Sequence, residues 1–407
     1  MQADNNTINF LFNKFRSYYE KKFVDSVKEI ERREFGIGAF GKKITERHLA
    51  FDSSRQFNEF LREEAPFYVS CSAAYYQFPD KRPMETKNYL KSDLVYEFDA
   101  DDLKTKCKEE HDSWRCIKCG AKGKGAISNC TECGASVISE QWVCNECLEE
   151  TKKESFKLIE LLKEDFDFEE GITVNFSGSK GYHVHVSSEK IFSLSNKARI
   201  ELVDYLTANS LSLENQGFNL DSMPLQCPKQ NERIGLNEKI MKWLAEIIER
   251  GEAERIAGIA GISFKAAKDF IKRKQKTLEN FDKGVLSPLP KKSKAFWFSL
   301  IKQAIEEIKV NLDRQTSIDA SKIIRVPDTI HGSTGLLAKS IPLEELKSFD
   351  PLKESIIFSS NPTKVFIGEA PKFCLGGEFF GPYDKREEIL PEFAAVYLTA
   401  RGSAAIR

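Results

Sequence analysis

Acidic residues stand at alternate positions in the segment DLVYEFDADDL, residues 93–103. Apolar and aromatic residues interleave with Glu97, Asp99 and Asp101, and this period of two predicts a β-strand. Glu97 and Asp99 would share one face with their Cα atoms about 6.5 Å apart, a spacing that suits two carboxylates bridging a pair of divalent cations. A solvent-facing acidic strand at the edge of a sheet is the alternative interpretation.

Cysteine spacing in residues 107–147 predicts zinc binding. Seven of the ten cysteines lie there, as three C-x2-C pairs and one C-x3-H, and two thiolates two residues apart can hold one tetrahedral Zn²⁺. We expect a zinc ribbon nested inside an outer site, although other pairings of these ligands remain open. The ribbon ligands would be Cys116, Cys119, Cys130 and Cys133, and the outer ligands Cys107, His111, Cys144 and Cys147. Four protein ligands leave no open position, so both sites would be structural.

A polar turn opens the segment FSGSKGYHVHV, residues 176–186. In the turn from Ser177 to Gly181, backbone N–H groups can approach phosphate oxygens without obstruction by Cβ atoms, and Lys180 adds a positive charge. The strand that follows places His183 and His185 on one face. His183 could donate to a phosphate oxygen, whereas we expect His185 to orient its neighbours or pack rather than touch a ligand.

A third polar segment, VNLDRQTSIDASKIIRVPDTIHGSTG, covers residues 310–335. It offers the acid Asp313, then Arg325 at the end of a short apolar stretch, then His331 in a turn. Each residue alone has an ordinary alternative explanation, as an exposed acid, a surface arginine or a loop histidine.

Helical patterns surround these segments. Residues 8–23 and 148–165 have apolar residues at helical spacing, and the chain is helical in character from about 196 to 309. Residues 254–271 resemble a helix-hairpin-helix only faintly, and an ordinary turn between helices is the favoured interpretation. Because the helical region separates the second polar segment from the third, the α/β parts on both sides must meet.

Composition bounds the class of protein. The 407 residues are 41% hydrophobic and 30% charged, with a net charge of −1, which is typical of a globular protein with two or three domains. Any site for a polyanion must be a local patch. The first residues lack the pattern of a signal peptide and no apolar run could span a membrane, so we expect a cytoplasmic protein.

The order of these segments resembles the small, catalytic subunit of the archaeal and eukaryotic type of DNA primase, and most closely its archaeal branch. REFGIGAFGKKITERHLAF (33–51) resembles the N-terminal motif of the family, and LPEFAAVYLTARG (390–402) its C-terminal part. The acidic strand, the SG..G.H segment and the segment from Asp313 to His331 resemble the motifs between them. The resemblance implies an α+β primase catalytic fold, with mixed β-sheets flanked by helices, a zinc-binding element that contains an inserted zinc ribbon, and an inserted helical subdomain.

The resemblance also implies residue roles. Two Mg²⁺ or Mn²⁺ ions would be held by Glu97, Asp99 and Asp313. Glu97 departs from the usual Asp, and Asp101 is the substitute candidate. The residues implied in nucleotide binding are Ser177, Gly178, Lys180, His183, Arg325, His331 and Arg47, with Glu34 and Arg33 as weaker candidates. The family often has a lysine where Ser333 stands. The outer cysteine cluster matches the single zinc site of the family, and the ribbon is an insertion.

We therefore expect a primase that makes short primers on single-stranded DNA from nucleoside triphosphates, with a large subunit as its partner. The expected organisation is a catalytic domain in three parts (1–106, 148–195 and 310–407), a zinc-binding element (107–147) and a helical subdomain (196–309). A repair-type primase-polymerase and a non-catalytic zinc-ribbon subunit that binds nucleic acid are the alternatives.

Overall fold

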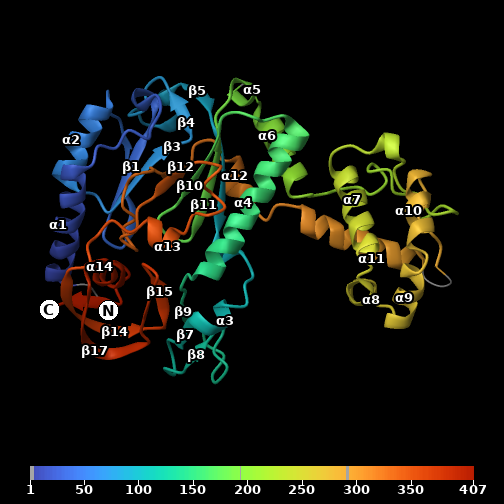
Figure 1. Cartoon of the computed structure of the whole chain (residues 1–407). Coiled ribbons are helices and arrows are strands. Elements are labelled where there is room, and N and C mark those ends of the chain that lie inside the picture. The colour runs from blue at the N-terminus through green and yellow to red at the C-terminus, as the bar shows by residue number, and fades with distance from the viewer. Residues whose placement is uncertain (1–3, 193, 290–292) are drawn as a thin grey trace. The chain divides into compact units, whose positions relative to one another are not determined.

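A computed structural model describes residues 4–192, 194–289 and 293–407 (Figure 1). The chain forms two compact units. The first contains the chain up to Phe156, then Glu169–Asn196 and Leu312–Arg407, and the second contains Lys157–Phe168 and Lys197–Asn311. Antiparallel sheets and helices are mixed in the first unit and the second is helical, which confirms the α+β class expected from the sequence.

One sheet of the first unit has the strand order β12-β3-β1-β2 and is antiparallel throughout. Its strands are β1 (Phe35–Ala39), β2 (Lys42–Leu49), β3 (Tyr68–Ser72) and β12 (Ile323–Arg325). The helices α1 (Asn5–Lys21) and α2 (Ser54–Glu64) pack on it through a core that includes Leu11, Phe15, Phe57 and Leu61. Asp4 and Ser53 cap these two helices with side-chain oxygens that accept from Thr7 N and Gln56 N.

A second sheet carries the acidic strand and has the order β13-β10-β11-β6. Its strands are β6 (Leu94–Asp99), β10 (Ile172–Phe176), β11 (Gly181–Val186) and β13 (Lys339–Ile341). The strand predicted from alternation is thus an edge strand, but its apolar residues are buried and Glu97 and Asp99 are only partly exposed. The two sheets meet where Ala73, Val95 and Ile324 pack together. A hairpin of β4 (Ala74–Tyr76) and β5 (Tyr89–Ser92) follows β3.

The cysteine-rich segment folds as a small separate sheet in the order β8-β7-β9. A one-turn 3-10 helix, η3 (Ala100–Asp102), and the short helix α3 (Lys108–His111) connect it to β6. The strands are β7 (Ser113–Cys116), β8 (Lys122–Lys124) and β9 (Val137–Glu140). The long helix α4 (Asn145–Phe166) leaves this element, where a helix was expected from residue 148.

The end of the chain returns to its beginning (Figure 1). The backbone N–H of Ile406 donates to Thr7 Oγ1 at 3.1 Å, and α14 lies against α1. The same part of the chain forms a sheet in the order β17-β14-β18, which packs against α14, and a separate hairpin of β15 and β16. These elements are α13 (Pro351–Glu354), β14 (Pro362–Ala370), β15 (Phe373–Leu375), β16 (Glu378–Phe380), β17 (Tyr383–Pro391), α14 (Glu392–Ala400) and β18 (Ala404–Ile406).

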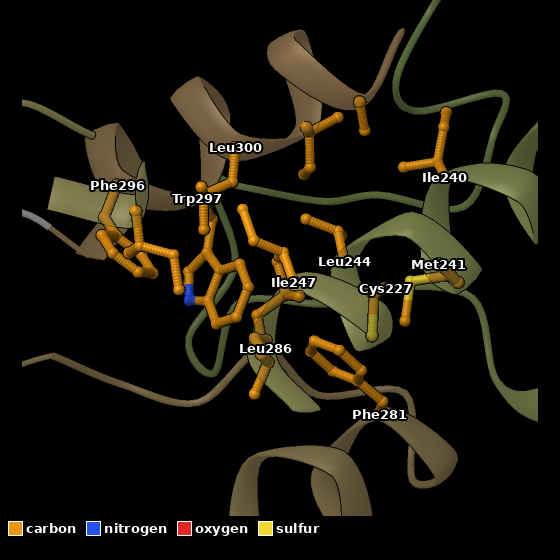
Figure 2. Packing of buried hydrophobic residues seen from close by; sticks show 14 of the residues in the cluster. Cys227, Ile240, Met241, Leu244, Ile247, Phe281, Leu286, Phe296, Trp297 and Leu300 are labelled. Carbon is orange, nitrogen blue, oxygen red and sulfur yellow. The ribbon is translucent and has the colours of Figure 1, made fainter. Parts of the chain in front are cut away.

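The second unit is built around Trp297, which is fully buried (Figure 2). Its indole ring contacts Phe270, Phe281 and Phe296 with centroids 5.1–5.8 Å apart, and its Nε1–H donates to Ser287 O at 2.9 Å. The helices are α6 (Asn196–Leu206), α7 (Leu236–Glu249), α8 (Ala253–Ala260), α9 (Phe264–Ile271), α10 (Lys274–Asp282) and α11 (Ser293–Ile308). Within the described ranges, no helix is long and apolar enough to cross a membrane.

Candidate active site

The carboxylates of β6 lie close enough to influence one another. Burial raises the pKa of Asp99 to about 6, and the negative charges of Glu97 and Asp101 add to this shift. Asp102 in η3 has a raised pKa for the same reasons, with burial first and then the charges of Asp101 and Asp313. Crowded carboxylates with this mutual repulsion are a donor set that fits a bound cation.

The strand β11 lies beside β6, and both of its histidines share a face with Glu97 and Asp99. In the antiparallel register, His183 is opposite Glu97, His185 is opposite Val95, and Gly181 is opposite Asp99. Burial lowers the pKa of His183 to about 4 and that of His185 to about 3, so both rings are neutral at pH 7. His183 Nδ1 and His185 Nε2 are buried without a hydrogen-bond partner among the described residues. Both atoms remain available for a ligand or a neighbouring side chain.

The turn before β11 is closed by Ser177, whose Oγ accepts from the backbone N–H of Ser179 and of Gly181, each at 3.3 Å. Gly178 has φ of 79°, and a Cβ there would lie 2.8 Å from His331 Cβ. A Cβ on Gly181 would lie 1.7 Å from Phe98 O. Gly178 is therefore required by the left-handed conformation of the turn and by its close neighbours, and Gly181 by the close approach of the backbone of β6.

The turn after β12 contacts this glycine turn directly. Thr334 Oγ1 donates to Gly178 O at 2.5 Å, and the backbone N–H of Ser333 donates to His331 Nδ1 at 3.4 Å. Because Nδ1 accepts, the proton of this buried imidazole belongs on Nε2. Burial lowers the pKa of His331 well below its usual value, so the ring is neutral. His331 is thus prepared to donate a hydrogen bond from Nε2.

Arg325 closes the same region from β12. Its Nη1 donates to Val69 O at 3.0 Å, and its guanidinium lies 5.1 Å from the centre of the Tyr68 ring. Burial lowers the pKa of Arg325 to about 10, which leaves it charged at pH 7. Its Nε has no hydrogen-bond partner within the described chain.

Asp313 lies at the start of the short helix α12 (Arg314–Ile318), which packs against β6. The residue is exposed, and its carbonyl accepts from Ser317 N at 3.1 Å. In the part of the chain that the structure describes, Glu97, Asp99 and Asp313 do not bring their oxygens within 4.8 Å of one another. The three acids occupy one region without forming a closed ligand cage.

Arg47 on β2 is held by a buried acid. Its Nε donates to Glu34 Oε1 at 2.9 Å, and Lys87 Nζ lies 3.4 Å from Glu34 Oε2. Glu34 and Lys87 are both fully buried, whereas the side chain of Arg47 is partly exposed. Arg33 instead forms an internal pair with Asp93 at 2.7 Å and also donates to Ser72 O and Ala73 O. Glu34 therefore orients Arg47, and Arg33 stabilises the fold.

The sequence did not predict roles for three lysines and one glutamine near these residues, namely Lys43, Lys108, Lys322 and Gln141, whereas Lys180 was expected. Lys180 forms an ion pair with Asp101 and lies 3.3 Å from Gln141 Oε1. Lys108 donates to Ala100 O at 2.5 Å and to Leu103 O at 2.6 Å, which fixes the turn after β6. The positive charges of Lys43 and Lys322 act on Asp99 and Glu97, respectively. For Lys43 the signal was its place in β2, two alternations before Arg47. Lys108 contacts nearby carbonyls in an irregular turn, and the contacts of Lys322 and Gln141 join distant segments.

The cysteines and His111 gather into two clusters in the described chain, with ligand atoms within 4.8 Å of one another. One contains Cys107, His111, Cys144 and Cys147, and the other Cys116, Cys119, Cys130 and Cys133. The Cys144 thiol, followed by His111, holds the pKa of Cys147 down to about 3. The backbone N–H of Cys119 holds the pKa of Cys116 down to about 6. Thiolates in tetrahedral sets of four fit Zn²⁺, so both clusters could hold this ion.

The Asp112 carboxylate contacts His111, one of the residues of the outer cluster. His111 Nε2 lies 3.3 Å from Cys147 Sγ, and its Nδ1 lies 2.8 Å from Asp112 Oδ1. The same oxygen accepts from the backbone N–H of Trp142 at 3.0 Å. A carboxylate on the second ring nitrogen fixes the tautomer and orientation of a metal-binding histidine.

Fold and site together define an α+β protein in which an acidic edge strand, a glycine turn and a histidine turn meet beside two cysteine clusters. A family model for the DNA primase small subunit matches residues 134–343, more than half of the chain. The chain belongs to this family, as its motifs indicated.

Relatives from archaea match almost the whole chain. The DNA primase small subunit PriS of Methanothrix thermoacetophila is 30% identical over 425 residues, which cover 99% of this chain and 100% of that protein. The protein of the same name from Methanococcoides burtonii is 28% identical, and that from Archaeoglobus fulgidus is 27% identical. Each of these two alignments covers 97% of both chains. The resemblance stated from the sequence is thereby confirmed.

Proposed function

We propose that this chain is the catalytic subunit of a DNA primase, which joins nucleotides on a single-stranded DNA template by nucleotidyl transfer. The observation that carries the proposal is the meeting of three separate segments. The acids of β6, the glycine turn before β11 and the histidine turn after β12 are joined by the β6–β11 pairing and by the Thr334 bond to Gly178.

Each group has a role that follows from its position. Lys180, Arg325 and the Nε2–H of His331 would bind the oxygens of the incoming triphosphate, and His183 would donate from the strand beside them. Arg47, held by Glu34, supplies a further positive charge from β2. Before a nucleotide binds, Lys180 is paired with Asp101, so binding of a triphosphate exchanges one anionic partner for another.

Glu97, Asp99 and Asp313 would hold the catalytic Mg²⁺ or Mn²⁺ ions, with Asp101 as a further candidate. When bound, such ions activate the attacking hydroxyl and neutralise the pyrophosphate that leaves. The raised pKa of Asp99 supports this role, because burial, together with the charges of Glu97 and Asp101, disfavours its ionised form, and a bound cation would offset that cost. The two cysteine clusters would each hold one structural Zn²⁺.

The proposal extends to partners and organisation. A primase large subunit, nucleoside triphosphates and template DNA are the proposed partners, and the cytoplasm is the proposed location. The helical segment 196–309 would be an inserted subdomain between the second and third parts of the catalytic domain, with the zinc-binding element between the first and second. The second compact unit, which contains Lys197–Asn311, supports this division.

Synthesis without a primer tests the function. Purified, zinc-loaded protein would be given a single-stranded DNA template, labelled ribo- or deoxynucleotides, and Mg²⁺ or Mn²⁺, with Asp99→Asn as the variant. Oligomers that need the template and vanish in the variant support a primase and reveal its nucleotide preference. Products that appear only with a supplied primer favour a repair-type polymerase. If no product forms even with a primer and a cognate large subunit, the non-catalytic alternative prevails.

A further inference from the structure

Lys322 connects the two sheets of the first unit. It directly precedes β12, but its side chain reaches the acidic strand β6 of the other sheet. Its Nζ donates to Val95 O at 2.8 Å and lies 3.6 Å from Glu97 Oε1. Only 11% of the Lys322 side chain is exposed, so the ammonium is largely withdrawn from water.

The main chain around Lys322 is fixed as well. Lys322 O accepts from the backbone N–H of Ala73 at 3.0 Å, and Ile324, two residues later, packs on Ala73 and Val95 where the sheets meet. The turn before it is closed by Asp319, whose Oδ1 accepts from Ser321 N at 2.8 Å and from Ser321 Oγ at 2.7 Å. The ammonium is therefore held at one place relative to β6, and it is more than a mobile surface charge.

The charge of Lys322 acts unequally on the two acids of β6. Glu97 has this ammonium as an ion-pair partner, whereas the positive charge that acts most on Asp99 is that of Lys43 on β2. The Lys322 ammonium thus holds the Glu97 side chain toward the place where the two sheets meet. A divalent cation that used Glu97 as a ligand would share this carboxylate with Lys322, at close range to a like charge.

We propose that Lys322 is a positioning residue that orients Glu97 and sets the affinity of the acidic strand for divalent cations. The inference rests on the proposed function, because it takes Glu97 and Asp99 as metal ligands. The ammonium fixes the Glu97 carboxylate through the ion pair and at the same time repels the cation. It therefore weakens binding of the metal alone while it favours the arrangement used in synthesis.

Lys322→Gln is the informative variant, because its amide can still donate to Val95 O but carries no charge. Binding of Mn²⁺ alone to zinc-loaded protein would be measured by isothermal titration calorimetry and electron paramagnetic resonance. We expect about tenfold tighter Mn²⁺ binding, because a positive charge close to the site is removed. At saturating Mn²⁺, kcat for synthesis should fall by about 10- to 100-fold, the effect of one charge-assisted hydrogen bond.

Three controls separate positioning from a general effect. Lys322→Arg keeps the charge and should restore Mn²⁺ affinity to within about threefold of the original protein. Lys364→Gln makes the same charge change on β14, in another sheet, and should leave Mn²⁺ binding unaltered. In a Glu97→Gln background, Lys322→Gln should shift Mn²⁺ affinity much less, because the shared carboxylate is gone.

Unchanged Mn²⁺ affinity in Lys322→Gln would overturn the inference, as would an equal shift with and without Glu97. If Lys322→Gln does not fold, Lys322→Met takes its place, because methionine also removes the charge while it keeps most of the length of the side chain. Unchanged Mn²⁺ affinity in Lys322→Met would overturn the inference in the same way. Failure of the proposed function has a different signature, in which Asp99→Asn binds Mn²⁺ as well as the original protein does.

Discussion

Glu97 and His183 lie directly opposite each other on the antiparallel strands β6 and β11. Directly opposed residues of a strand pair share one face of the sheet. The pairing therefore aims an acid from the first polar segment and an imidazole from the second into the same space. It also brings Asp99 opposite Gly181, the last residue of the glycine turn. An acidic strand and a glycine turn about 80 residues apart in the chain are thereby brought side by side.

The position of Asp99 predicts that a loss of function can accompany a gain in stability. Its pKa is raised from 3.8 to about 6, first by burial and then by Glu97 and Asp101. A carboxyl group with a raised pKa in the folded state favours folding while it is protonated, and that contribution is lost as pH rises from about 3.8 through about 6. At pH 7.5 the ionised Asp99 destabilises the metal-free fold by on the order of 1–3 kcal/mol.

Asp99→Asn should therefore unfold at a higher temperature than the original protein at pH 7.5, without added Mg²⁺ or Mn²⁺ and with zinc bound. The difference should disappear below about pH 4, where Asp99 is protonated in both states. Thermal unfolding followed by circular dichroism across this range measures it. A variant that is destabilised equally at all pH values would contradict the electrostatic explanation.

Local spacing was enough to predict much of the site. Alternation identified β6 and β11, and the C-x2-C pairs identified the two sets of cysteines that the structure gathers. These signals are local because a strand or a knuckle turn fixes the relative positions of residues a few places apart. The helix after the cysteines was also expected, and it begins at Asn145, three residues earlier than the pattern indicated.

Contacts between distant segments could not be predicted in this way. Lys180 and Lys322 acquire their partners from the packing of distant segments, which single-sequence periodicity does not encode. His185 was placed on the correct face by alternation, but its burial arises from the packing of two sheets on each other. Asp313 was expected as a metal ligand from the resemblance alone, because its place before α12, which packs against β6, depends on contact with a distant strand.

The ion pair between Lys180 and Asp101 predicts the effect of removing the lysine. Lys180→Met should raise KM for nucleotides by about 10- to 100-fold, the effect of one charge-assisted hydrogen bond, with a smaller change in kcat. Gln141→Ala removes only the 3.3 Å contact that holds Lys180 and should raise KM a few-fold, on the order of a neutral hydrogen bond. Steady-state kinetics with varied nucleotide measures both.

Lys118→Met is the matched control, because Lys118 is an exposed lysine of the cysteine-rich element. It should leave KM for nucleotides unchanged. Equal KM values for Lys180→Met and the original protein would remove Lys180 from the nucleotide site.

The two cysteine clusters should differ in their importance for catalysis. Cys107 of the outer cluster directly precedes Lys108, whose ammonium fixes the carbonyls of Ala100 and Leu103 just after Asp99. Cys147→Ser should therefore lower the unfolding temperature and abolish synthesis, since loss of this site releases the turn that follows the acidic strand. Cys119→Ser opens the ribbon, whose contacts lie mostly within itself, and should retain most nucleotide binding.

Zinc content by elemental analysis, together with binding of a fluorescent nucleotide, measures this difference. Each variant should lose about one Zn²⁺ per chain, as expected when one ligand of a tetrahedral site is removed. Loss of nucleotide binding in Cys119→Ser but not in Cys147→Ser would reverse the assignment of the two sites.

The glycine turn provides a prediction about stability that does not depend on any ligand. A Cβ at Gly181 would lie 1.7 Å from Phe98 O, at the end of the pairing between β11 and β6 where Gly181 is opposite Asp99. Gly181→Ala must push these strands apart or bend the turn, and we expect it to destabilise the fold by roughly 2–4 kcal/mol. The acids and His183 would move relative to each other, so synthesis should fall as well.

Gly258→Ala is the control, since Gly258 lies in α8 with nothing within 4 Å of its added Cβ and no left-handed backbone. Alanine favours a helix over glycine by about 1 kcal/mol, so this variant should be as stable as the original protein or slightly more stable. Urea unfolding of both variants, monitored by tryptophan fluorescence and far-ultraviolet circular dichroism, separates the two effects. If Gly181→Ala unfolds at the same urea concentration as the original protein, β11 does not pair with β6 as closely as the structure indicates. The shared surface of Glu97 and His183 would then have to be reconsidered.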